Sequence, residues 1–335
     1  MIRIISTFII SLVVVLLFQQ ESHSVCPPPV GSTTTCTDNQ PNPDLNGVDE
    51  TGNPSNVTVI MLPGSAIDTR LSSGGSGEEG IAGGDAMNTI TLNDARIDSE
   101  NESIETETGD DVVNITDSEL MNLNVNTVEL GGGSNILNIT RSSIINANGR
   151  VLSMTPGNDQ ADNVTIIDSE VKTLISSSAL ETGSSSDNVF IENSIIQGGS
   201  NINAVPEVID LGSNDDVLRL STGADIRGVT NNGINFGNGF IDCGADFDTI
   251  IFEMRVATNQ LEAITAEIES KNPAEDQITI NNLTYIWIDC EELVADVRGG
   301  FTTAVPTLSE WGLIAMAGVL GLIGFAVIRR RQAAA

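Results

Sequence analysis

The sequence predicts an all-β fold, a right-handed parallel β-helix, closed by a small α+β cap near its C-terminal end. Three observations carry this prediction. A short apolar motif recurs about every 28 residues. Apolar and polar residues alternate within the motif, and turns rich in Gly, Ser and Asn separate its copies. Alternation gives a strand one buried face, and regular recurrence lets that face stack on the equivalent face of the next turn.

The first apolar residue of the motif lies at positions 57, 90, 113, 137, 164, 189, 217 and 250, in steps of 33, 23, 24, 27, 25, 28 and 33 residues. Alternation is clear in Val113 and Ile115, and again in Val164 and Ile166. A second apolar patch follows about 14 residues later, for example at residues 208–211. Because one unit cannot bury its own apolar face, we expect about eight stacked turns.

Other repeat folds agree less well with these units. A helical repeat would show apolar residues at a 3.6-residue spacing, whereas these units are dense in β-branched residues, Asn and Gly. A β-propeller needs longer units with an aromatic residue in each blade, and the chain has only one Tyr and two Trp. A β-sandwich remains the alternative fold.

The repeats are followed by a segment with a different pattern, residues 253–298. Apolar residues at helical spacing predict an amphipathic helix across residues 259–272, and alternation predicts a hairpin across residues 277–288. We expect this segment to cap the last turn, whose open edge would otherwise pair with other chains. Two aromatic residues are expected in the core of the cap, Tyr285 and Trp287.

The two ends of the chain carry export and membrane signals. Residues 1–24 have the positive, apolar and polar parts of a signal peptide, with cleavage expected before Val25. Residues 311–328 form an uncharged stretch of 18 residues that predicts a transmembrane helix, and Arg329, Arg330 and Arg331 follow it. Positive charge stays in the cytoplasm, so everything before this helix should lie outside the inner membrane. The predicted divisions are 1–24 signal peptide, 25–55 N-terminal extension or linker, 56–252 β-helix repeats, 253–298 cap, 299–310 linker and sorting motif, and 311–335 transmembrane helix and basic tail.

Four cysteines fit an exported protein, because disulfides persist in oxidising compartments. Local pairing predicts the bonds Cys26–Cys36 and Cys243–Cys290, and the other connectivities remain open. Metal binding is the competing interpretation. It has no CxxC pair and no usable histidine, since the only histidine, His23, leaves with the signal peptide.

Composition excludes several classes of function. The formal net charge is −32, and such a surface repels phosphate backbones, so we expect no nucleic-acid partner. Without a histidine in the exported chain, a Ser-His-Asp triad, a Cys-His pair and a His-bound metal are all excluded. We therefore predict no catalytic residue and no cofactor.

A polysaccharide-acting β-helix enzyme, a lyase or hydrolase that uses Asp carboxylates, is the alternative function. Its candidate carboxylates are the doublets Asp110-Asp111 and Asp215-Asp216. Neighbouring residues on a strand point to opposite faces, and Asp favours turns. We therefore expect the aspartates of both doublets to stabilise turns.

Calcium binding stays open as a second alternative for the acidic residues. Asp246 and Asp248 lie in a segment that partly matches a Ca²⁺-binding nonapeptide, and Asp159 and Asp162 lie in a similar turn. A calcium roll needs this motif in tandem every nine residues, and the chain lacks such a tandem array. The preferred interpretation is therefore that these aspartates stabilise turns.

The C-terminal residues also resemble a known sorting signal. The run Val305-Pro306-Thr307-Leu308-Ser309-Glu310-Trp311-Gly312, followed by an apolar stretch and three arginines, is similar to the IPTL-CTERM signal, one of the PEP-CTERM-like tails. The resemblance covers about 30 of 335 residues, and Val305 stands where Ile is usual. It implies a Gram-negative, envelope-sorted protein whose tail an exosortase-like membrane enzyme recognises through Pro306, Thr307 and Leu308.

The repeats, for example residues 211–220, resemble those of autotransporter-type passenger β-helices, although no outer-membrane barrel is expected after them. The leading hypothesis is a non-enzymatic, exported cell-surface or extracellular-matrix protein, adhesin-like or structural. Its expected partners are the sorting enzyme, the inner membrane through the C-terminal helix, and a polysaccharide or matrix component.

Overall fold

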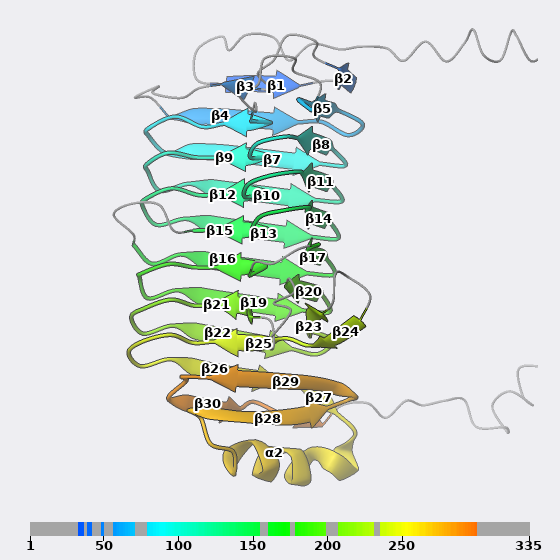
Figure 1. Cartoon of the computed structure of the whole chain (residues 1–335), viewed down its shortest axis with the longest axis vertical. Helices are drawn as coiled ribbons and strands as arrows, with labels where there is room; N and C mark the ends of the chain where they lie inside the picture. Colours follow the sequence, from blue (N-terminus) through cyan, green and yellow to red (C-terminus); the bar gives the residue numbers. More distant parts are fainter. Residues whose placement is uncertain are drawn as a thin grey trace, which may run out of the picture.

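The computed structural model describes residues 33–36, 39–41, 48–49, 56–70, 79–154, 160–174, 178–198, 207–230 and 235–299. Within these residues the chain winds as a parallel β-helix, with three long sheets around one elongated core (Figure 1). The predicted signal peptide, sorting motif and transmembrane helix lie outside the described residues. In the part that the structure describes, no helix has the length and apolar character needed to cross a membrane.

Sheet 1 is formed by the strands that contain the start of the apolar motif. Its strands pair in parallel throughout. In spatial order they are β1 (Thr33–Cys36), β4 (Val57–Met61), β7 (Asn88–Asn93), β10 (Val112–Thr116), β13 (Ile136–Thr140), β16 (Asn163–Ile167), β19 (Asn188–Glu192), β22 (Val217–Ser221), β26 (Thr249–Glu253) and β30 (Glu292–Ala295).

Sheet 2 follows sheet 1 after a two-residue bend in most turns, and its strands are short. In spatial order they are β2 (Asn39–Pro41), β5 (Ala66–Asp68), β8 (Arg96–Ser99), β11 (Glu119–Asn122), β14 (Ser143–Asn146), β17 (Glu170–Thr173), β20 (Ile195–Gly198), β23 (Asp225–Thr230) and β24 (Asn235–Asn238). The last strand, β24, pairs with β23 in the antiparallel direction.

Sheet 3 contains the second apolar patch of each unit. Its spatial order is β3 (Val48–Asp49), β6 (Ile81–Ala82), β9 (Ile104–Glu105), β12 (Val128–Glu129), β15 (Leu152–Ser153), β18 (Leu180–Glu181), β21 (Glu207–Asp210), β25 (Phe240–Asp242), β29 (Leu283–Ile288) and β28 (Glu275–Ile280). A separate pair of short strands joins β27 (Arg255–Val256) to β31 (Arg298–Gly299).

The core consists of apolar columns, in which each residue stacks on its counterpart one turn away. Val113, Leu137 and Val164 are consecutive members of the sheet 1 column, and all are buried. Full burial of such side chains contributes about 1.5–3 kcal/mol each. At two positions the predicted first residue of the motif is not the one that stacks in the column. Val59, not Val57, stacks on Ile90, and Leu218, one residue after the predicted start, stacks on Ile250.

The β-helix begins earlier than predicted. Strands β1, β2 and β3 pair in parallel with β4, β5 and β6, so these three strands belong to the β-helix, in a segment that was predicted to be an extension or linker. The physical reason is the composition of β1 (TTTC) and β2 (NQP), which lacks the apolar alternation by which the later strands are recognised.

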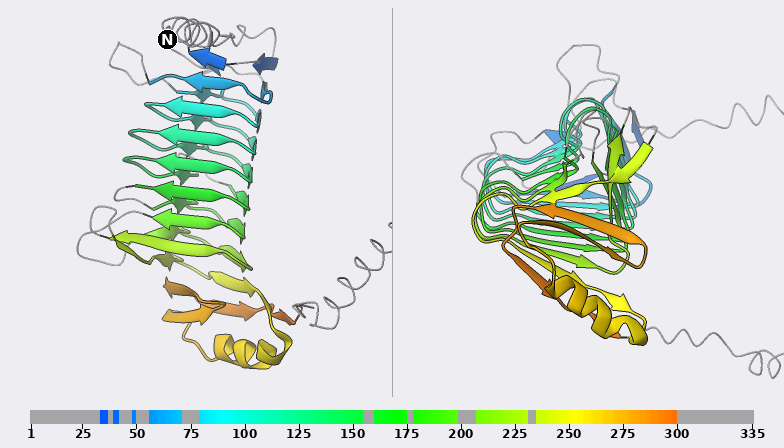
Figure 2. Two further views of the ribbon diagram at one scale, coloured as in Figure 1. Left: turned by 90° about the vertical axis from the view of Figure 1, so that its right-hand side faces the viewer. Right: turned by 60° about the horizontal axis from the view of Figure 1, so that its bottom comes forward.

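The predicted cap is confirmed in its main parts. Helix α2 (Leu261–Glu269) follows a short 3₁₀ helix η1 (Thr258–Gln260), and β28 and β29 form the antiparallel hairpin. Its turn, Asn281-Asn282, has positive φ at both residues, as a two-residue hairpin turn requires. Strands β29 and β30 also continue sheets 3 and 1 in parallel, so the cap adds part of another turn before α2 closes the end (Figure 2).

Candidate functional site

A column of buried Asn and Asp side chains lies where each turn enters sheet 1. Apart from Asn88, which begins the column, each member accepts on Oδ1 the backbone N–H of the equivalent residue one turn earlier, at N···O distances of 2.6–3.0 Å. Glu291 ends the column by accepting the N–H of Asp248 at 2.8 Å. The members are Asn88, Asp111, Asn135, Asp162, Asp187, Asp216 and Asp248, all almost fully buried.

This column explains the two Asp doublets. Asp111 and Asp216 point inward as members of the column, whereas the carboxylates of Asp110 and Asp215 accept the N–H groups of Ser134 and Phe247 at the surface. Neither doublet aims two carboxylates at one point in solvent. The arrangement agrees with the prediction that these aspartates stabilise turns.

A polar groove runs along the bend between sheets 1 and 2, with a volume of about 510 Å³. In five successive turns the bend contains one residue with φ between 45° and 52°, a conformation that Asn and Asp tolerate better than most residues other than Gly. Those residues are Asp94, Asp117, Arg141, Asp168 and Asn193. Because the bend recurs in register, the side chains of successive turns meet at the surface.

Two carboxylates in this groove, those of Asp117 and Asp168, are bound by side chains of the next turn. Arg141 donates from Nε and Nη2 to the two carboxylate oxygens of Asp117 at 2.7 and 2.8 Å, and these bonds hold the pKa of Asp117 below its ordinary value. Asn193 donates to Asp168 at 2.6 Å. Glu119 and Glu170 also line the groove. The groove presents hydrogen-bonding groups to a ligand, but its best-defined carboxylates are already engaged.

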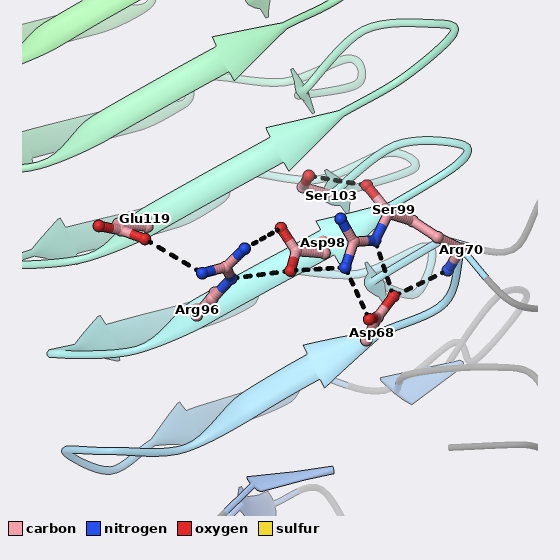
Figure 3. A network of polar contacts seen from close by, with 7 residues as sticks. All are labelled: Asp68, Arg70, Arg96, Asp98, Ser99, Ser103 and Glu119. Atoms are coloured by element: carbon pink, nitrogen blue, oxygen red, sulfur yellow. Dashed lines mark hydrogen bonds and ion pairs between the residues drawn. The ribbon is translucent and has the colours of Figure 1, made fainter. Parts of the chain in front are cut away.

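A second charged network covers the first turns of sheet 2 (Figure 3). Asp98 is almost fully buried and lies between two arginines, with Arg96 Nε at 2.7 Å and Arg70 Nη2 at 3.1 Å. Arg70 also holds Asp68 through two bonds of 2.8 and 2.9 Å, and Arg96 reaches Glu119 at 3.6 Å. Arg96 therefore connects this network to the edge of the groove.

The outer face of sheet 3 carries an acidic column. Glu105 stacks on Glu129, and further along Glu181 stacks on Asp210, which stacks on Asp242. Arg150 forms an ion pair with Glu181 within this face. Partial burial raises the pKa of Asp210 and of Asp242, so part of this face holds protons more tightly than free carboxylates do.

One group on this face has the geometry to hold a metal ion. Glu79, Glu102 and Glu105 offer carboxylate oxygens that lie within 4.8 Å of one another. Burial, followed by the charges of neighbouring glutamates, raises the pKa of Glu102 and that of Glu105 to about 7. Oxygen ligands of this kind suit Ca²⁺ or Mg²⁺. Sequence reasoning missed this group, because Glu79 comes from the turn before that of Glu102 and Glu105.

The calcium candidates of the sequence lie elsewhere. Asp248 and Asp162 are members of the buried column, and Asp246 accepts the N–H of Asn214 at 3.2 Å. Asp159 lies outside the described residues. The structure therefore places the three described candidates in separate backbone-binding roles.

The cap aromatics are core residues, as predicted. Tyr285 and Trp287 are fully buried, and both rings meet Phe252 edge-on, with ring centroids 5.6 and 5.9 Å apart. The Tyr285 hydroxyl donates to Ala224 O at 2.8 Å. The predicted Cys243–Cys290 disulfide is present, whereas the predicted Cys26–Cys36 bond involves a residue outside the described part of the chain.

These observations define the class of molecule: a parallel β-solenoid whose turns are joined by buried polar columns and whose outer faces carry paired charges and an acidic column. Comparison with known proteins adds its most specific feature, since residues 303–332 match the IPTL-CTERM motif. No curated protein and no solved structure matches the chain.

The match confirms the sorting signal that was predicted from Val305 to Gly312 and the arginines after it, all of which lie outside the described residues. IPTL-CTERM signals are processed by sorting enzymes of the exosortase type. The motif therefore marks this β-solenoid as a protein exported to the cell surface.

Proposed function

We propose that the chain is a non-enzymatic cell-surface or extracellular-matrix protein, adhesin-like or structural. Its β-solenoid serves as a stalk that the C-terminal signal delivers to the envelope. The use made of its acidic residues supports this proposal. Carboxylates in the core bind backbone N–H groups of the neighbouring turn, and those best placed in the groove bind Arg141 and Asn193.

A general acid needs access to its substrate and a proton held near the working pH. Asp111 and Asp216 are sealed in the core and have no such access. Asp117 faces solvent, but Arg141 lowers its pKa, which keeps it ionised. The groove is therefore better suited to holding a ligand than to transferring protons.

One observation favours the alternative, a polysaccharide-acting enzyme. On the outer face of sheet 3, burial and then the charges of Asp210 and Asp242 raise the pKa of Glu207 to about 7. A half-buried carboxyl of this kind beside a second carboxyl is the arrangement that hydrolases use for acid catalysis. Glu207 and Asp210 are the pair to test for this activity.

Turnover separates the two functions. The full chain is incubated with a panel of neutral and acidic polysaccharides between pH 5 and 8, and new reducing ends and unsaturated products are followed over time. We expect no release above that of heat-unfolded chain. Product release that Glu207→Gln/Asp210→Asn abolishes and the exposed control Asp215→Asn retains would replace the structural function with an enzymatic one.

Exposure of the solenoid on intact cells tests whether the C-terminal signal delivers the chain to the envelope. Protease applied to intact cells should remove the solenoid when the chain carries its signal. Deletion of residues 303–332 should abolish this surface pool, because the sorting enzyme then has no substrate. The control keeps the signal and replaces only the exposed Asp215 by Asn. Equal surface exposure with and without residues 303–332 would contradict delivery by this signal.

A further inference from the structure

The buried column contains two kinds of side chain in the same structural position. Asn88 and Asn135 occupy two turns, and aspartates occupy the others. In Asn135 and the aspartates the Oδ1 atom performs the same task of accepting an N–H from the preceding turn, whereas Asn88, at the start of the column, accepts the N–H of Gly84. The two kinds differ only in the second atom of the side chain, which is an N–H donor in Asn and an oxygen in Asp.

In the Asn turns this second atom is a satisfied donor. Asn135 Nδ2 donates to Gly131 O at 2.8 Å, and Asn88 Nδ2 donates to Gly84 O and Ala86 O, each at 2.9 Å. In these two turns the surroundings of the column thus offer backbone carbonyls to a donor at this position. A carbonyl oxygen attracts an N–H or O–H group and repels a carboxylate oxygen.

In the Asp turns the second atom is sealed in the core. Asp111, Asp216 and Asp248 each have an Oδ2 atom that is closed off from solvent and has no hydrogen-bond partner. Asp216 and Asp248 each accept one backbone N–H, whereas Asp111 accepts two N–H groups from Asn88. A buried ionised carboxylate with so few donors would carry a large desolvation cost. A proton on Oδ2 removes the charge and turns that oxygen into the donor that Asn provides.

The charges around these residues point the same way. Those that act on Asp216 belong to Asp187, Asp248 and Asp215, all of them acidic. Burial is the main reason that the pKa of Asp216 is raised to about 8, and these like charges add to it. For Asp248, burial and the charges of Glu291, Asp215 and Asp246 raise the pKa to about 6.

We propose that the C-terminal part of the buried column is a proton-dependent latch. Asp216 and Asp248 are carboxylic acids in the folded protein, each protonated on Oδ2, and their deprotonation loosens the contact between the last turns of the solenoid and its cap. The latch joins β19, β22 and β26, and Glu291 extends it to the start of β30.

The sign of the pH effect follows from linkage. An unfolded Asp has a pKa near 4, and both residues hold their protons more tightly when folded. Their contribution to the free energy of unfolding is therefore complete below about pH 4. It decreases as the pH rises through about 6 for Asp248 and about 8 for Asp216.

The first test compares wild type with Asp216→Asn/Asp248→Asn in the full-length chain, by urea unfolding at pH 5 and pH 9. Asn imitates the protonated acid, as it does naturally at Asn135. We expect the urea midpoint of the wild type to fall between the two pH values and that of the double variant to fall less. Hydrogen exchange should show protection of the Asp187 and Asp216 amides decreasing about tenfold or more in the wild type only.

Two further variants serve as matched comparisons. Asp215→Asn makes the same chemical change at the exposed neighbour of Asp216. It should keep most of the wild-type pH dependence, because it removes one like charge and leaves burial, the main cause of the raised pKa values, unchanged. Asn135→Asp introduces the acid into an Asn turn and should create an additional loss of stability as the pH rises. This variant also keeps the proposal testable if the double variant does not fold.

Two outcomes would overturn the latch. One is an equal fall of the urea midpoint in wild type and double variant, together with no added pH dependence in Asn135→Asp. The other is a rise of the wild-type midpoint at pH 9 on adding CaCl₂ at constant ionic strength, absent in the double variant. That result would assign the sealed oxygens to a cation instead of a proton.

Discussion

Buried hydroxyl groups show how single residues hold one turn to the next. Ser142 accepts the N–H of Ser118 at 3.0 Å and donates to Thr140 O at 2.8 Å, and Ser169 accepts the N–H of Ser142 in the same way. The bend between sheets 1 and 2 leaves this N–H without a place in either sheet. A Ser at the inner side of the bend supplies the missing acceptor, since buried N–H groups need partners.

Replacement of Ser142 by Ala tests this role. The N–H of Ser118 then stays buried without an acceptor, which should lower the free energy of unfolding by about 1–3 kcal/mol. Urea unfolding measures the change. Ser143→Ala is the matched control, because Ser143 is the outward-facing neighbour, and it should alter stability by less than about 0.5 kcal/mol. Equal effects of the two variants would contradict the role of the hydroxyl.

At the scale of elements, the distance between turns is set by glycine at the corner that leads from sheet 3 to sheet 1. Gly183, Gly212 and Gly244 have φ of 106°, 90° and 89°. A Cβ atom on Gly212 would lie 1.7 Å from Gly183 O, and one on Gly244 would lie 1.7 Å from Gly212 O. Only a residue without a side chain lets the backbones of successive turns approach this closely.

Gly212→Ala and Gly64→Ala separate backbone strain from collision. Both glycines have positive φ, 90° and 82°, but a Cβ on Gly64 meets nothing within 4 Å. Gly64→Ala should cost about 1–2 kcal/mol, the cost of the left-handed conformation alone. Gly212→Ala should cost clearly more in urea unfolding, because its Cβ collides with backbone. A difference of less than about 0.5 kcal/mol between them would contradict turn spacing by close approach.

At the scale of the whole molecule, a disulfide fastens the cap to the solenoid. Cys243, which directly follows β25, is joined to Cys290 beyond β29, across 47 residues of sequence. The cap closes the open end of sheet 1 and sheet 3, so its attachment protects strand edges that would otherwise pair with other molecules.

Cys243→Ser/Cys290→Ser should therefore lower the free energy of unfolding by about 4 kcal/mol, the value for closing a loop of this length. The variant should also form soluble aggregates, as strand edges become accessible in the loosened cap, and light scattering would detect them. Reductant should reproduce the effect in the wild type and leave the variant unchanged. Unaltered stability after full reduction would contradict the role of the bond.

Sequence patterns were sufficient for the features that rest on local chemistry. Alternating apolar residues such as Val164 and Ile166 predict sheet 1, and Asn281-Asn282 between alternating residues predicts the hairpin. Sheet 2 was not anticipated as a separate sheet, because most of its strands are too short to establish a period. The polar columns also escaped prediction, since Asp216 before a strand looks the same whether it faces solvent or a turn 29 residues away.

The columns also have a direction. Every N–H in the Asn/Asp column and in the serine column bonds to a side chain from a later turn of the chain. An exported chain that crosses the membrane N-terminus first would thus complete each turn only on arrival of the next. The growing solenoid would always end in one unsatisfied turn that awaits its successor, and Glu291 would be the side chain that finishes assembly.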